Sequence, residues 1–157
     1  YTIHELYFSR PVIFDCPKKP GEIIEIRDLK GLRLSSNPDI LLLRTGFSRF
    51  RGKNDKIYRY ENPCLRPETS SWLRERFPFL RALGIDCISF SSRANRPMGG
   101  INHKIFLGQE GVKRNSVLLI EDMYLPSDIK KLKAIMVVPF NILGIDSAPC
   151  TVIGVKQ

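Results

Sequence analysis

Short apolar runs, separated by polar, glycine-rich or proline-rich segments, organise the first third of the chain. Residues 11–15 and 39–45 form two such runs, each too short for a typical helix, and they predict buried strands. Residues 23–26 are expected to extend the same sheet. The four residues that follow, 27–30, predict a short helical turn that ends at Gly31.

The middle of the chain begins with a segment that lacks the short apolar runs of the first third. Residues 46–64 are polar, basic and aromatic without a regular period, and they predict a long loop, a kind of segment that is often functional. Pro67 and Glu68 suit the first turn of a helix, which is expected to run to about Arg76. Residues 84–90 predict a third strand.

The last third begins with a segment rich in Ser, Asn, Arg, Pro and Gly. This segment, 91–102, predicts a loop with a hinge at Gly99 and Gly100. The rest is predicted, in order, as a short helix at 104–108, a strand at 117–121, a small helix containing Pro126, and strands at 134–140 and 150–155 that complete the sheet. This alternation indicates an α/β fold, a mixed sheet with flanking helices, in a single domain over 1–157.

Composition narrows the class of protein. A hydrophobic share of 43% and a charged share of 26% are typical of a globular domain. The net charge of +9 is spread along the chain without a nucleic-acid-binding motif, so neither a nucleic acid nor a membrane is the expected partner. With no apolar stretch of eighteen residues, a soluble cytoplasmic protein is expected.

The four cysteines lack a Cys-x-x-Cys pair and are interpreted as reduced thiols, with Cys87 as a buried hydrophobe.

Histidine is scarce, since the chain has only His4 and His103. His103 follows a glycine-rich segment, and Glu121 ends an apolar strand, where an unpaired charge would be unfavourable. Sites in α/β folds gather at such strand ends. On residue type alone, a structural hydrogen-bonding role is the favoured interpretation of His103, and a catalytic or metal-binding role for the pair is the alternative.

Five segments also carry a family resemblance, in the order 39–48, 63–73, 84–86, 102–108 and 118–122. They resemble the cyclase family of metal-dependent hydrolases, which includes bacterial kynurenine formamidases and isatin hydrolases. The resemblance implies the swivelling β/β/α domain of that family. It also implies hydrolysis of amide-type C–N bonds, in formamides or cyclic amides, by water that a zinc or manganese ion activates.

The resemblance gives specific roles to the candidate pair. His103 matches the family's late active-site histidine and Glu121 its late glutamate, which bind metal in two-metal relatives and lie nearer a proton-transfer role in one-metal relatives. Their separation, 121 − 103 = 18 residues, is longer than expected, so Asp122 is kept as a substitute for Glu121. Pocket-shaping residues, with core packing or surface exposure as the alternative, are Phe47, Tyr58, Tyr60, Arg93 and Arg96.

The family's His-x-Gly-Thr-His-x-Asp-x-Pro-x-His metal motif does not occur in the 157 residues, and it is expected upstream of Tyr1. His4 falls after that motif and receives no metal role. Without the motif, His103 and Glu121 under-coordinate an ion, so the chain alone is expected to be a poor catalyst. The resemblance further implies a small-molecule substrate and a homodimer or homotetramer. The alternative function is a non-catalytic cyclase-like subunit or interaction domain that lacks the metal motif.

Overall fold

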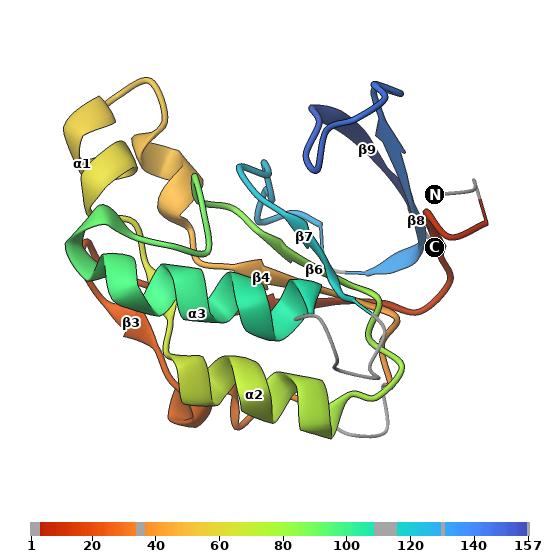
Figure 1. Cartoon of the computed structure of the whole chain (residues 1–157), viewed down its shortest axis with the longest axis horizontal. Helices are drawn as coiled ribbons and strands as arrows, with labels where there is room; N and C mark the ends of the chain where they lie inside the picture. Colours follow the sequence, from red (N-terminus) through yellow and green to blue (C-terminus); the bar gives the residue numbers. More distant parts are fainter. Residues whose placement is uncertain (1–3, 34–36, 109–115, 130, 157) are drawn as a thin grey trace.

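A four-stranded parallel sheet forms the centre of the computed structural model, which describes residues 4–33, 37–108, 116–129 and 131–156. Its order is β2-β4-β6-β7 (Figure 1), and its strands are β2 (Pro11–Asp15), β4 (Ile40–Arg44), β6 (Ala82–Ile85) and β7 (Leu118–Ile120). All of β4 is buried, because it lies between two neighbouring strands. β2 forms an edge, and most of its residues are only half-buried.

Two helices cover one face of this sheet (Figure 1). They are α2 (Pro67–Arg76), which begins with a proline as expected, and α3 (Arg96–Leu107). Leu41 and Leu43 point to the helices, since alternate residues of a strand face opposite sides. Leu73 of α2 and Phe106 of α3 meet them in the larger of two hydrophobic cores.

A second sheet packs on the opposite face. It is antiparallel, with the order β1-β8-β9, and consists of β1 (Tyr7–Phe8), β8 (Leu132–Pro139) and β9 (Cys150–Lys156). Its buried side chains, such as Ile135 and Val137, join Ile40 and Leu42 in the second hydrophobic core. The layers therefore run sheet, sheet, helices, and the expected β/β/α fold class is confirmed.

The shorter elements correct several predictions. Residues 46–64 are not a long loop, because they hold η3 (Phe47–Phe50), α1 (Asp55–Tyr60) and the first residue of β5 (Cys64–Leu65). Asn54 caps α1 by accepting a hydrogen bond from the backbone N–H of Ile57. β3 (Ile23–Ile24) pairs with β5 and does not extend the central sheet. The turn predicted at 27–30 is η1 (Ile26–Leu29).

The last third of the chain differs more from the elements predicted for it. Gly99 and Gly100 are no hinge, because both lie inside α3, which follows η4 (Arg93–Asn95). The predicted strand 84–90 is β6, which ends before Asp86, where the chain turns away. Pro126 lies beside a turn, not in a helix. The two last strands form the hairpin of the second sheet and do not complete the first. Residues 109–115, in the polar stretch before Glu121, lie outside the described part.

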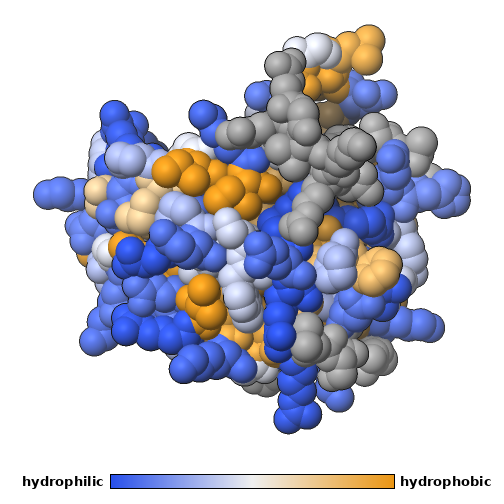
Figure 2. Space-filling view, turned by 60° about the horizontal axis from the view of Figure 1, so that its bottom comes forward, coloured by the Kyte–Doolittle hydropathy of each residue, from blue (hydrophilic) through white to orange (hydrophobic). Residues whose placement is uncertain are grey.

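The surface adds two observations. The face seen in Figure 2 is mostly hydrophilic, with hydrophobic residues in separate patches. None of the helices in the described residues is long and apolar enough to cross a membrane.

All four cysteines are free, and Cys87 is fully buried as expected, which raises the pKa of its thiol and keeps it protonated.

Candidate functional site

The carboxyl ends of the four parallel strands meet at one edge of the central sheet. The residues after β4 are held there by Asp86, which follows β6 and is fully buried. Its carboxylate accepts hydrogen bonds from the backbone N–H groups of Thr45 at 2.7 Å and Gly46 at 2.8 Å, and from the Thr45 hydroxyl at 2.5 Å. This arrangement gives the edge a fixed backbone on which side chains can be positioned.

Two predicted site residues come together at this edge. His103, from the middle of α3, places Nε2 3.4 Å from Oε1 of Glu121, the first residue after β7. The other ring nitrogen, Nδ1, lies 2.9 Å from the carbonyl oxygen of Gly99. A carbonyl only accepts, so Nδ1 carries a proton and Nε2 is the atom that exchanges protons or binds a ligand.

Glu121 is held by more than the histidine. Its Oε1 also accepts hydrogen bonds from the Ser89 hydroxyl and the Phe90 backbone N–H, each at 2.9 Å. Both donors belong to the loop between β6 and η4. The carboxylate therefore links this loop, β7 and α3 at one point.

The contacts shift the pKa values of the pair in opposite directions. The hydrogen bond with Glu121 raises the pKa of His103 above 6.5, against a smaller lowering by burial. Burial raises the pKa of Glu121, but the hydrogen bonds from His103, Phe90 and Ser89 together outweigh it and hold that pKa below 4.5. Both shifts favour the charged form of the group concerned, although each side chain is about one-third exposed (34% and 30%).

A close approach of α3 to the β6–η4 loop keeps His103 in place. A Cβ atom added to Gly99 would lie only 2.1 Å from Cβ of Ser91, well inside any real contact distance. The helix can touch the loop this closely only because residue 99 has no side chain. The same loop supplies Ser89 and Phe90 to Glu121.

Asp122, the substitute considered for Glu121, has other partners. Its Oδ1 accepts short hydrogen bonds from the Tyr58 hydroxyl and from Nη2 of Arg51. Its backbone adopts a φ of 58°, unusual for a residue other than glycine. Burial and the Asp122 carboxylate together raise the pKa of Tyr58. In the structure it is therefore Glu121 that pairs with His103.

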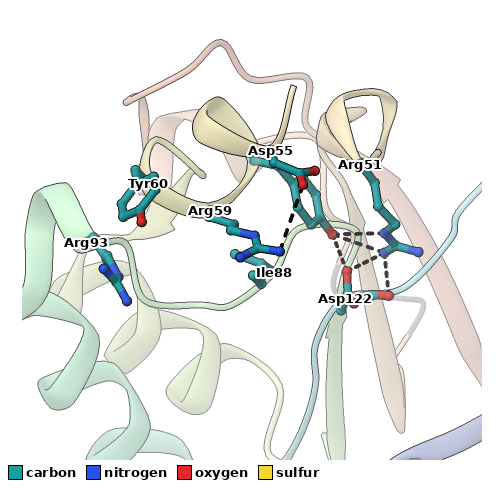
Figure 3. A pocket seen from close by; sticks show the side chains of 8 residues that line it. Arg51, Asp55, Arg59, Tyr60, Ile88, Arg93 and Asp122 are labelled. Carbon is teal, nitrogen blue, oxygen red and sulfur yellow. Dashed lines mark hydrogen bonds and ion pairs between the residues drawn. The ribbon is translucent and has the colours of Figure 1, made fainter. Parts of the chain in front are cut away.

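Two adjoining hollows open beside these residues. The first, of about 420 Å³, is lined by Arg51, Asp55, Tyr58, Arg59, Tyr60, Ile88, Arg93 and Asp122 (Figure 3). The second, of about 410 Å³, is lined by Arg59, Asn62, Ile88, Ser89, Ser91, Ser92, Arg93, Arg96, Gly99, Gly100 and His103. Because Arg59, Ile88 and Arg93 line both, the hollows meet, and the ring of His103 is reached from the second.

Four of the five residues considered as pocket-shaping line the hollows, and the fifth does not. Tyr58, Tyr60, Arg93 and Arg96 line the hollows, whereas Phe47 is fully buried in the core. Two further lining residues, Arg51 and Arg59, were missed because 46–64 was predicted as a loop. The sequence did contain a signal for α1, namely the capping residue Asn54 followed by a turn with aromatic and basic residues. His4 lies exposed in a turn.

The described residues do not by themselves make a metal site. His103 and Glu121 offer two ligand side chains, whereas a catalytic zinc site has three protein ligands. Within the described ranges, no three His, Cys, Asp or Glu side chains gather closely enough to hold an ion. His103 and Glu121 therefore fit as part of a metal site and not as a complete one.

Two comparisons give relatives of the chain. A protein of Haemophilus influenzae without an assigned function is 30% identical over 90 residues, which are 54% of this chain and 63% of that protein. Isatin hydrolase A from Labrenzia aggregata, in a structure bound to benzyl benzoate, is similar in fold with a TM-score of 0.69 and 15% identity. That similarity covers 99% of this chain and 64% of the isatin hydrolase chain. The chain spans less than two thirds of either relative.

The family assignment rests on a match to a family model. Residues 2–92 match the family described as "Putative cyclase", a range that ends before His103 and Glu121. It includes the first three strands of the central sheet, α1 and α2. Because the match extends over more than half of the chain, the protein belongs to this cyclase family.

Proposed function

We propose that the chain supplies the His103–Glu121 part of a metal-dependent hydrolase site that cleaves amide-type C–N bonds, as in formamides or cyclic amides. The observation that carries the proposal is the 3.4 Å approach of His103 Nε2 to Glu121 Oε1 beside an open hollow. The cyclase family and the fold shared with an isatin hydrolase support the reaction class.

The pair suits the proton transfers of this reaction. Hydrolysis adds a hydroxyl group to the carbonyl carbon and a proton to the nitrogen as the C–N bond breaks. His103 has a raised pKa and can donate the Nε2 proton to the departing nitrogen. The proton that the attacking water releases then restores His103, while Glu121 holds the ring in position. The protons balance over one cycle.

Metal dependence is part of the proposal, with zinc or manganese as the ion. Since two ligand side chains are too few, the proposal requires further ligands outside the described residues. Nε2 of His103 cannot hold a proton and a metal ion at once. In its proton-transfer role His103 therefore does not bind the ion through Nε2, and the zinc or manganese would be held by the further ligands.

Activity assays on the full-length protein test the proposal directly. With added zinc or manganese, hydrolysis of simple formamides and lactams is expected, and it should stop when a chelator is added. His103→Ala and Glu121→Gln should each lower kcat/KM by about 100-fold or more, as loss of a proton-transfer group does. Lys104→Gln, an exposed neighbour of His103 on α3, is the matched control and should leave kcat/KM unchanged.

Two results would contradict the proposal. Hydrolysis that survives both substitutions would place the chemistry elsewhere. A protein that binds no divalent ion and hydrolyses no amide would favour the alternative, a non-catalytic cyclase-like subunit or interaction domain.

A further inference from the structure

We infer that the substrate carries an anionic group, a carboxylate or a phosphate, which Arg93 and Arg96 bind in the hollow beside His103. The inference rests on the proposed function and adds to it the class of substrate. Both arginines line the second hollow together with Arg59 and His103.

The charge of this hollow is one-sided. Its lining includes three arginines, and none of its described lining residues is an aspartate or glutamate. The adjoining first hollow holds two carboxylates, of which Asp122 already accepts from Arg51 at 2.5 Å. Asp55 lies 3.9 Å from Arg59, a long and exposed ion pair (Figure 3). Positive charge at the mouth of the His103 hollow is therefore largely uncompensated by the described residues.

Arg93 and Arg96 are available to a ligand. Arg93 places its guanidinium 4.9 Å from the centre of the Tyr60 ring, a contact that orients the side chain without neutralising it. In the part of the chain that the structure describes, the side chain of Arg96 has neither a hydrogen bond nor an ion pair with another residue. A guanidinium presents several N–H donors in a fork that matches the oxygen atoms of carboxylates and phosphates.

The backbone places both arginines close to the reacting pair. Arg93 opens η4 and Arg96 is the first residue of α3, the helix that carries His103. The positive end of the α3 dipole also lies at Arg96 and adds to the attraction for an anion. Ser89 and Ser91 line the same hollow and connect it to Glu121 through the 2.9 Å hydrogen bond from Ser89. An anion held by the arginines therefore lies in the hollow that leads to the proposed catalytic pair.

A binding experiment tests the anion site without any assumption about catalysis. Benzoate, phenyl phosphate and the neutral benzamide are titrated into the full-length protein and followed by calorimetry. Both anions should bind at least tenfold more tightly than benzamide, and the better of the two identifies a carboxylate or a phosphate as the natural group. Arg93→Gln and Arg96→Gln should each weaken anion binding by about tenfold.

Arg76→Gln is the matched control. Arg76 is also exposed and stacked on an aromatic ring, that of Trp72 at 5.9 Å, but it lies on α2 outside both hollows. Its substitution should leave anion binding unchanged, and thermal unfolding should show that all three variants are folded. Equal affinity for benzamide and the anions, or equal losses in all three variants, would overturn the inference.

Hydrolysis assays separate this inference from the proposed function. Formanilide is compared with its carboxylate-bearing analogue, 4-formamidobenzoate, and with the corresponding phosphate. The ratio of kcat/KM for a charged over the neutral substrate should favour the charged one and fall about 100-fold in the Arg93→Gln/Arg96→Gln double variant. Anion binding without hydrolysis would refute the proposed function and leave the anion site standing. Hydrolysis with a ratio unaffected by the double substitution would overturn the anion site alone.

Discussion

Glu121 and Asp122 are consecutive in the chain, yet their carboxylates serve different partners. Glu121 accepts from His103 and from the β6–η4 loop, whereas Asp122 accepts from Tyr58 and Arg51. The left-handed backbone of Asp122 turns the chain between them. The two carboxylates can therefore be tested separately by substitutions that keep their shape.

The pKa of His103 should depend on Glu121 and not on Asp122. Glu121→Gln removes the charge that favours the imidazolium, so the pKa of His103 should fall towards or below 6.5. Asp122→Asn should leave it in place, and asparagine tolerates the positive φ at that position. Titration of the ring protons of His103 by NMR measures this in each variant and in the unsubstituted protein. A larger effect of Asp122→Asn would mean that the wrong carboxylate was assigned.

The pair should also stabilise the fold in a defined pH window. The raised pKa of His103 gives stability that is complete below pH 6.5 and lost as the pH rises through the higher folded value. The lowered pKa of Glu121 gives stability that is complete above pH 4.5 and lost as the pH falls through the lower folded value. Urea unfolding should therefore show the largest loss for His103→Gln between about pH 4.5 and 6.5, of at most about 1 kcal/mol because the pair is partly exposed. A loss that is independent of pH would reflect packing alone.

The two neighbouring glycines of α3 should respond in opposite ways to alanine. Gly99→Ala forces a Cβ against Ser91, and this overpacking should destabilise the fold by about 1–3 kcal/mol. A Cβ on Gly100 meets nothing within 4 Å, so Gly100→Ala should stabilise the helix by about 0.5–1 kcal/mol. Chemical denaturation of both variants gives the two values. Equal effects would show that α3 does not press on the loop.

Asp86 should be among the most sensitive carboxylates of the fold. Asp86→Ala leaves two buried donors of Thr45 and the half-buried N–H of Gly46 without an acceptor, and a loss of about 3 kcal/mol is expected. Asp55→Ala removes only an exposed ion pair with Arg59 and should change stability by about 0.5 kcal/mol or less. The free energy of unfolding of both variants provides the comparison. Similar values for the two would contradict the anchoring role of Asp86.

Elements that depend on local sequence were predicted well. The strands β2, β4 and β7 follow continuous apolar runs, and α2 begins at its expected proline. Only the end of α3 was predicted, as a short helix at 104–108, because the glycine pair lowers helix propensity. Gly99 is required by a contact between α3 and a loop, and the local pattern does not contain that contact. The pairing of β3 with β5 is likewise a contact between distant segments.

The site could be predicted only in part. His103 and Glu121 were candidates from the scarcity of histidine and their places in the pattern, and the family resemblance gave the pair its roles. Apolar periodicity carries no information on which side chains meet at a sheet edge. The positions of Arg51 and Arg59 depend on η3 and α1, which the irregular pattern of 46–64 concealed. Asp122 was a reasonable substitute from spacing, but in the structure its left-handed backbone accompanies different partners, Tyr58 and Arg51.

His103 follows Arg96 by seven positions on α3, so in the proposed anion site this helix sets the preferred length of the substrate. Seven residues are close to two helical turns, so the two Cα atoms lie on the same side of α3 and about 10 Å apart along its axis. A short amide substrate cannot contact both Arg96 and His103, and a long one would have to fold back on itself. Among formamides with spacers of increasing length before the charged group, one intermediate spacer should therefore give the highest kcat/KM. Equal kcat/KM values across the series would show that the distance along α3 does not set the preferred substrate length.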